Sequence, residues 1–528
     1  MRYTLSLTWE PHVCGKRGTV VGARRVALCL LAVGLDTTVL NTALPTLSTT
    51  LGASTSELQW ITDSYNLVLA ALLLPAGLLG DRYGRKRLIM GALAVFGAGS
   101  VWSAYSTSPG ELAAARAVLG VGAAFLIPLV VAGVLVLFEP AERPRAIAVV
   151  TLGSMVGIPL GPIAGGLLLH GFWWGSVFLI NAPVAVVGLI AVATLLPESR
   201  NPDASGLDPF GIALSAAGMV GVTYGVIEAG DRGWTDVRSL GPLIGGVVIL
   251  GLFIVVERRV ARTRDALIDL ALFRARAYTA GTILVTIMAF ALFGVLFNTP
   301  QYLRGVLGAD SLGTGLRLLP MLGAMMVGVQ TATRVVQRIG PKAIVTVGLL
   351  VTSAGLFLGA FTTTATSYGE AAVWFALFGL GVGLSIPTAT LAAVGSLEKA
   401  RAGAGSALVF ATRQLGSTVG VAILGTLALA RYRGGLDLPG AAGDTAARDS
   451  VTSGVAVAHR LHDPALLTSV QTAFVHGMDL TLWLCGGISL AGAALALAIL
   501  PGHTPPPTAP AVPSQASPSE PALTEDVR

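Results

Sequence analysis

The chain has 528 residues, of which 53% are hydrophobic and only 12% are charged, and its net charge is +6. This composition excludes an ordinary soluble protein, and the basic excess is explained by the loops of a membrane protein rather than by nucleic-acid binding. Fourteen apolar stretches follow one another, each long enough to cross a hydrocarbon core of about 30 Å as a helix. We therefore predict an all-α polytopic membrane protein with 14 transmembrane helices.

The charges between these stretches predict the topology. Most of the 34 Lys and Arg residues fall in every second loop, beginning with the N-terminal tail. Because cytoplasmic loops carry such an excess, we expect both termini in the cytoplasm. The predicted helices begin near Val26, Leu58, Leu88, Leu112, Ala146, Trp173, Leu207, Leu240, Tyr278, Leu312, Ala343, Ala371, Gly405 and Val475.

Several sequence patterns occur twice, each time offset by eight predicted helices. LGVGAAFLIP at residues 119–128 recurs as LGVGLSIP at 380–387, and the RxGxK spacing that begins at Arg82 recurs at Arg338. The shared offset predicts six helices, two inserted helices and six more. Two parallel six-helix halves with a site between them are the arrangement of a rocking-bundle transporter.

The domain organisation follows from this repeat. The Pro-rich C-terminal tail is too poor in apolar residues to form a core, so we expect it to be disordered. The predicted parts are a cytoplasmic tail (1–25), an N-terminal six-helix bundle (26–200), two inserted helices with a cytoplasmic linker (201–270), a C-terminal six-helix bundle (271–500) with an extracytoplasmic loop (431–470) that could hold a short helix, and the tail (501–528).

Five polar residues inside the predicted spans are candidates for proton coupling and substrate binding. A charge at mid-membrane costs about 2.5–3.5 kcal/mol on insertion scales, so its presence indicates a function. Asp36, near Asn41 in the first span, is the first candidate, with a structural buried pair as the alternative. Arg116 is either a functional partner or a side chain that snorkels from the helix end. Asp63 is predicted in outer turns that water reaches, and Arg413 lies well inside the thirteenth span.

The loop after the second predicted span combines glycines with charged residues. Asp81 could accept hydrogen bonds from helix-end amides or from an arginine, while its basic neighbours stay in water. Such a loop could act as a latch that holds one access state closed, or it could be a simple positive-inside anchor. Its residues are Gly77, Asp81, Arg82, Gly84, Arg85 and Lys86.

The fifth predicted helix carries a stripe of glycines at every fourth position. This spacing gives a smooth helix face that a neighbouring helix can approach closely. Packing alone and a special role in antiport explain the stripe equally well. Its members are Gly153, Gly157, Gly161, Pro162 and Gly165.

These stretches resemble the motifs of one transporter family. GLLGDRYGRKRL at residues 77–88 is similar to the signature of the major facilitator superfamily, and LGSMVGIPLGPIAGG at 152–166 to the motif of its antiporters. LDTTVLNTALP at 35–45 resembles the fourteen-helix drug:proton antiporters in particular. The resemblance implies the major facilitator fold and coupling to protons. One departure is Leu119, which stands where the family's fourth-span motif has a hydrogen-bonding glutamine.

The sequence indicates transport and not catalysis. It contains no GxxxxGK[ST] phosphate loop, and its histidines and cysteines have no ligand spacing. We expect no cofactor, no metal and no nucleic-acid partner. The predicted function is proton-coupled efflux of small amphipathic organic compounds by alternating access. We expect a monomer in the lipid bilayer of the inner (cytoplasmic) membrane of a bacterium. The alternatives are a dedicated exporter of an endogenous metabolite, lipid or amino acid, and a membrane sensor that transports nothing.

Overall fold

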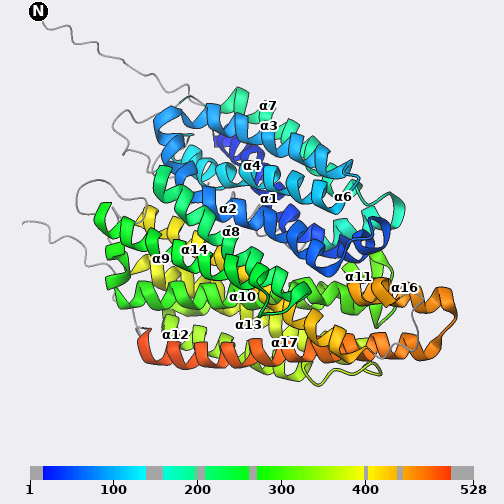
Figure 1. Cartoon of the computed structure of the whole chain (residues 1–528). Helices are drawn as coiled ribbons and strands as arrows, with labels where there is room; N and C mark the ends of the chain where they lie inside the picture. The colour runs from blue at the N-terminus through cyan, green and yellow to red at the C-terminus, as the bar shows by residue number, and fades with distance from the viewer. Residues whose placement is uncertain are drawn as a thin grey trace, which may run out of the picture.

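A computed structural model describes residues 16–137, 157, 160–196, 198, 209–260, 270–397, 402–436 and 444–500. Every regular element in these ranges is a helix (Figure 1), which satisfies its own backbone hydrogen bonds as a hydrocarbon core requires. The elements are α1 (Lys16–Thr50), α2 (Thr55–Tyr83), α3 (Arg85–Ala104), α4 (Pro109–Leu137), α6 (Ser176–Leu179), α7 (Asn181–Leu195), α8 (Pro209–Arg232), α9 (Val237–Val260), η1 (Leu270–Arg274), α10 (Arg276–Gly305), α11 (Ser311–Arg317), α12 (Leu319–Gly359), α13 (Tyr368–Gly395), α14 (Ala402–Gly435), α15 (Asp444–Asp449), α16 (Val451–Leu461) and α17 (Pro464–Ile499).

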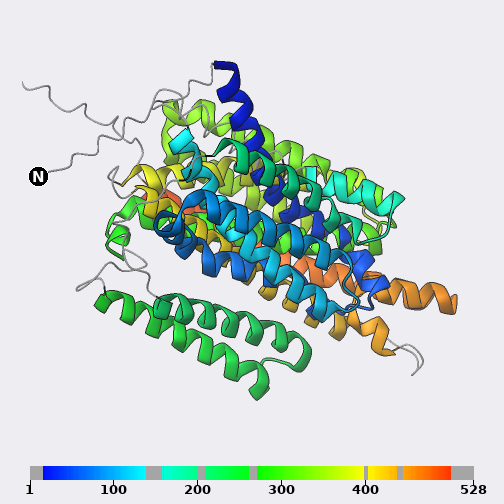
Figure 2. The same cartoon turned by 90° about the horizontal axis from the view of Figure 1, so that it is seen from above.

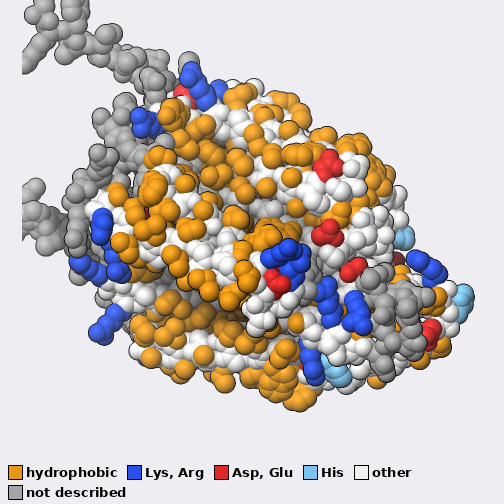
Figure 3. Space-filling view, in the orientation of Figure 1, with side chains coloured by type: hydrophobic (Ala, Val, Ile, Leu, Met, Phe, Trp, Pro, Cys, Tyr) orange, Lys and Arg blue, Asp and Glu red, His pale blue; other side chains and the backbone are white. Residues whose placement is uncertain are grey.

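Twelve helical segments of the described residues are long and apolar enough to cross a membrane. Two of them come from the stretch Ser311–Gly359, which is divided near Gly340. The 29-residue α2 and a shorter apolar helix, Leu160–Gly171, occupy the second and fifth predicted places, and the count of fourteen spans stays a prediction. Apolar side chains dominate the middle of the molecule, and most charged ones lie toward its two ends (Figure 3). The chain is a multi-pass membrane protein.

The two RxGxK loops share a backbone conformation as well as a sequence pattern. Gly84 follows the end of α2 with a φ of 105°, and Gly340 interrupts α12 with a φ of 80°. Side chains are strained at such angles, so glycine allows the sharp turn between successive spans. The start of α2 is also well defined, because Ser54 and Glu57 form a capping box there.

The helices pack into two groups that lie one above the other in Figure 1. One apolar core joins α10, α12, α13, α14 and α17, and two others are built mainly from α1 to α4, α6 and α7. The helices α8 and α9, which correspond to the predicted inserted pair, run beside these groups (Figure 2). Its two helices approach closely, since a Cβ added to Gly221 would lie 2.9 Å from Gly246 Cα. The domain boundaries themselves stay predictions.

The predicted loop 431–470, which we expected could hold a short helix, contains more helix than that in the residues that the structure describes. α14 continues to Gly435, α15 and α16 follow, and α17 begins at Pro464 rather than near Val475. The Asp463 carboxylate caps α17 by accepting from the Ala465 and Leu466 amides. Hydropathy missed α16 because only one face of this helix is apolar, and that face joins the α10–α17 core. We call the end of the bundle at α16 the α16 end, and the end at which α1 begins the tail end.

Candidate functional site

Asp36 and Arg116 form a buried ion pair within the first group of helices. Arg116 Nη1 donates to Asp36 Oδ2 over 2.6 Å, and Asn181 Nδ2 donates to Asp36 Oδ1 over 2.8 Å. The side chains of Asp36 and Arg116 are only 0% and 2% exposed. Both carboxylate oxygens are therefore engaged, so any ligand or proton must compete with a cation and an amide. Asn181, at the start of α7, was not among the candidate site residues.

Arg116 does not snorkel to the membrane surface, although its position near a helix end allowed this. Its guanidinium lies 4.4 Å from the Tyr65 ring centroid and 5.9 Å from that of Phe178. Its Nε also donates to the Ile61 carbonyl over 3.4 Å. Two aromatic faces, a carbonyl and a carboxylate hold the cation away from water. Leu119, on the same helix, is buried in an apolar cluster, so a hydrophobic contact occupies the position of the family glutamine.

The glycine stripe lies directly against the helix that carries Asp36. A Cβ on Gly157 would lie 2.8 Å from Leu35 N, and one on Gly161 would lie 2.9 Å from Leu35 O. At Gly165 the nearest atom is Val39 Cγ2, at 3.1 Å. Glycine therefore allows the fifth predicted span to touch the α1 backbone beside Asp36. Gly153 lies outside the described residues.

Asp63 is fully buried, which corrects the expectation that water reaches it. Its side chain is 0% exposed, and neither carboxylate oxygen has a hydrogen-bond partner among the described residues. Gln59 and Asn66, one turn away on either side, both bond to α14: Gln59 Nε2 donates to Ala422 O over 3.0 Å, and Asn66 Oδ1 accepts from Gln414 at 2.5 Å. Asp63 thus occupies the seam between α2 and α14.

Arg413 lies on the α14 side of this seam. Its guanidinium is 4.4 Å from the Phe410 ring centroid, and its buried Nε has no hydrogen-bond partner within the described ranges. No ion pair joins it to any residue that the structure describes, Asp63 included. Asn41, the remaining candidate, is 4% exposed on α1. The structure thus brings Asp36 and Arg116 together, whereas Asp63 and Arg413 have no ion-pair partner among the described residues.

Another acidic residue deserves inclusion with these candidates. Asp479 would lie close to the start of a helix that begins near Val475, as predicted, but α17 begins at Pro464, which places Asp479 well inside this helix. It is partly buried, and its Oδ1 has no hydrogen-bond partner in the described part of the chain. The error in the start of α17 hid this residue from the sequence analysis.

The predicted latch loop is held by a residue that the sequence analysis did not select. Glu198, just beyond α7, accepts from the Lys86 amide over 3.2 Å and lies 3.5 Å from Arg87 Nε. A Cβ on Gly84 would meet Glu198 Oε1 at 2.5 Å, so glycine is needed for this approach. Lys86 Nζ donates to Ala193 O over 2.8 Å. The surroundings of Gly77 and the side chain of Asp81 are not among the features that the structure describes.

The two helix groups meet through polar contacts at the α16 end. Ser48 of α1 bonds to Ser450 at 2.6 Å, and Thr55 of α2 donates to Asp449 O at 2.6 Å. Arg304 of α10 donates to Thr46 at 2.5 Å. These bonds link the ends of α1 and α2 to the helices that follow residue 270. The α16 end is therefore closed in this structure.

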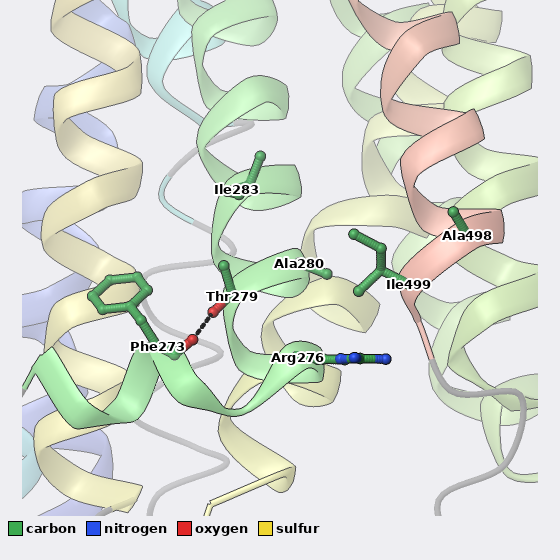
Figure 4. A pocket seen from close by; sticks show the side chains of 7 residues that line it. All are labelled: Phe273, Arg276, Thr279, Ala280, Ile283, Ala498 and Ile499. Atoms are coloured by element: carbon green, nitrogen blue, oxygen red, sulfur yellow. Dashed lines mark hydrogen bonds between the residues drawn. The ribbon is translucent and has the colours of Figure 1, made fainter.

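A separate cavity of about 340 Å³ lies at the tail end, where α10 begins and α17 ends (Figure 4). None of its lining residues belongs to α1, α4 or α7, the helices that carry the Asp36 network. No group of His, Cys, Asp and Glu able to hold a metal occurs in the described residues. The cavity is lined by Phe273, Arg276, Thr279, Ala280, Ile283, Ala498 and Ile499.

The family is decided by comparison with known proteins. The family model described as Major Facilitator Superfamily matches residues 26–421. The chain belongs to this superfamily. This superfamily member is a transporter and not an enzyme, and the predicted major facilitator fold is confirmed.

Several curated relatives are similar to this superfamily member along most of its length. The tetracenomycin C resistance and export protein of Streptomyces glaucescens is 33% identical over 487 residues, which cover 89% of this chain and 90% of that protein. The multidrug efflux pump LfrA of Mycolicibacterium smegmatis is 34% identical, with 89% and 94% covered. The methyl viologen resistance protein SmvA of Salmonella typhimurium is 32% identical, with 88% and 95% covered.

Solved structures agree on the fold. A bacterial homolog to the human lysosomal transporter Spinster, in an inward-facing and unoccupied conformation, matches with a TM-score of 0.66 at 15% identity, covering 92% of this chain and 97% of that one. A D-xylose-proton symporter matches with a TM-score of 0.61, also at 15% identity, covering 92% and 99%. At such identities the likeness establishes the fold alone.

Proposed function

We propose that this protein exports small amphipathic organic compounds in exchange for protons, by alternating access. Relatives named as multidrug, methyl viologen and tetracenomycin C resistance proteins support the substrate class. The observation that carries the coupling is the buried Asp36–Arg116 pair, because a carboxylate enclosed by protein can exchange its cation partner for a proton. Each proton that crosses about 100 mV supplies about 2.3 kcal/mol for uphill export.

The geometry of the network suggests how a proton drives the change of state. While Asp36 is charged, it holds α4 through Arg116 and α7 through Asn181. A proton on Asp36 removes the charge that compensates Arg116, and an uncompensated buried cation is costly. The protonated site therefore favours a rearrangement of α1 against α4. Asp63, Arg413 and Asn41 would take part in proton or substrate binding along the same path.

The two helix bundles, the latch loop and the glycine stripe have proposed roles in opening and closing the two ends of the protein. We propose that the halves 26–200 and 271–500 rock about the site, with the α16 end facing outward and closed here, and the tail end cytoplasmic. The latch of Gly77, Asp81, Arg82, Gly84, Arg85 and Lys86, held by Glu198, would close the tail end in the opposite state. The glycine stripe would keep the fifth span against α1. The protein would act as a monomer in the inner membrane.

Transport into sealed proteoliposomes tests this function. An imposed pH gradient should drive accumulation of several cationic or neutral amphipathic compounds, and an equal sodium gradient should not. A second candidate, a dedicated exporter of one compound, is favoured by two relatives named for tetracenomycin C and actinorhodin. A compound panel separates the two: broad uptake indicates drug efflux, and a single transported compound indicates the dedicated exporter. No flux of any compound would contradict both.

A further inference from the structure

The tail-end cavity has a polar mouth and apolar walls. Arg276 is the first residue of α10 and extends toward the end of α17, as Figure 4 shows. Ile283 and Ile499, on the walls, are 42% and 40% exposed on the outside of the bundle. No lining residue is acidic. The cavity is thus a groove on the outer surface of the bundle. It has one cationic group, the Arg276 guanidinium, and an apolar surface beside it.

The depth of these groups matches the polarity profile of a membrane. Arg276 begins one span and Ile499 ends another, so both lie where the bundle leaves the hydrocarbon. Ile283 lies seven residues further along α10, about 10 Å deeper at 1.5 Å per residue. A cation at headgroup level above an apolar wall at acyl-chain level suits a molecule that is anionic at one end and hydrocarbon at the other.

One side-chain donor at the mouth of the groove, the Arg276 guanidinium, is available to bind such a molecule. Arg276 makes no hydrogen bond or ion pair with any residue that the structure describes. The Thr279 hydroxyl is already used, because it donates to Phe273 O over 2.6 Å. Ala275 caps α10 without a side-chain hydrogen bond, so the helix start adds positive potential beside the guanidinium.

We propose that this groove binds one anionic phospholipid of the surrounding bilayer, with its phosphate on Arg276 and an acyl chain along Ile283 and Ile499. Guanidinium binds a phosphate through two parallel hydrogen bonds, which favours phosphate over other headgroup parts. A zwitterionic headgroup binds less well because it carries its own compensating cation. The bound lipid joins the start of α10 to the end of α17. This site is separate from the transport site, so its occupancy does not depend on the transported compound.

Native mass spectrometry of the full chain, released from detergent and titrated with phosphatidylglycerol, tests the proposal. Wild-type protein should retain one tightly held phosphatidylglycerol and little phosphatidylcholine. Arg276→Gln should weaken phosphatidylglycerol binding about fivefold, the effect of one arginine at a membrane surface. Arg274→Gln is the matched control, because Arg274 is exposed nearby and does not line the groove. Arg276→Lys should keep most of the affinity.

A second variant tests the apolar part and covers the case in which Arg276→Gln does not fold. Ile283→Trp fills the wall and keeps the cation, so it should also weaken phosphatidylglycerol binding. Soluble glycerol phosphate should not compete with the lipid at equal concentration. Equal effects of Arg274→Gln and Arg276→Gln, equal retention of phosphatidylcholine, full affinity in Ile283→Trp, or competition by glycerol phosphate would each overturn the proposal.

Discussion

Arg116 donates to Asp36 over 2.6 Å although 80 residues separate the two in the chain. The contact joins α1 to α4 inside the first group of helices, and both side chains are excluded from solvent. Because the pair is buried, removing either charge changes both the energetics of folding and the state of the site.

Removal of the Asp36 charge should abolish coupling. Asp36→Asn keeps the shape of the side chain but cannot bind and release a proton, so export driven by a pH gradient should be lost in proteoliposomes. Membrane insertion should be normal, and slow downhill movement of uncharged substrates should persist. Asp36→Glu keeps the titrating group and should retain partial activity. If the Asn variant concentrates substrate at the normal rate, Asp63 becomes the next candidate.

Removal of the Arg116 charge should destabilise the fold. Arg116→Met leaves Asp36 buried with only Asn181 as a partner, at a cost of about 3–5 kcal/mol in the free energy of unfolding. The double variant Asp36→Asn/Arg116→Met buries no charge at this site and should recover most of that loss. Unfolding of the purified proteins in detergent would measure both values. A double variant as unstable as the single one would contradict the ion-pair interpretation.

A methyl group on the glycine stripe should disturb the site through α1. In Gly161→Ala the new Cβ would lie 2.9 Å from both Leu35 O and Val39 N, next to Asp36, so the two helices must separate. We expect lower thermal stability and lower transport. Gly171→Ala is the control on the same helix, because a Cβ there meets nothing within 4 Å. Equal behaviour of the two variants would show that close packing at Gly161 is not required.

The latch should act on the balance of access states. Asp81→Asn should leave insertion and substrate binding largely intact and slow turnover, and Glu198→Gln should act in the same direction by weakening the contacts with Lys86 and Arg87. Accessibility labelling of single cysteines on both faces would report the shift. Normal flux together with unchanged labelling would contradict the latch and would leave the positive-inside anchor as the interpretation of this loop.

The orientation of the chain can be tested with reporters. Because basic residues concentrate in alternate loops, a fusion after Arg264 should be cytoplasmic and a fusion at Gly443 extracytoplasmic. If the reporter after Arg264 were extracytoplasmic and the one at Gly443 cytoplasmic, the proposed topology would be the wrong way round. That result would also reverse the proposed direction of transport.

The sequence by itself determined the class of structure and the family. Length and hydropathy of a span are local properties, so twelve of the predicted spans have a matching apolar helix among the described residues, α8 and α9 included, although α17 begins earlier than predicted. Positive φ favours glycine locally, and the two RxGxK loops that the sequence pairs each contain a glycine with positive φ, Gly84 and Gly340. Hydropathy did not predict α16, because this short helix is apolar on one face only and so does not have the hydropathy of a membrane span.

Only the tertiary structure decided which polar residues meet. Hydropathy indicates that Asp36, Arg116 and Asp63 lie in spans, but it carries no information on which face of a helix turns toward which neighbour. Helix packing pairs Asp36 with Arg116 and Asn181, and it buries Asp63 without a partner among the described residues. A low-dielectric interior makes that difference large, because the same carboxylate is stable when paired and costly when alone.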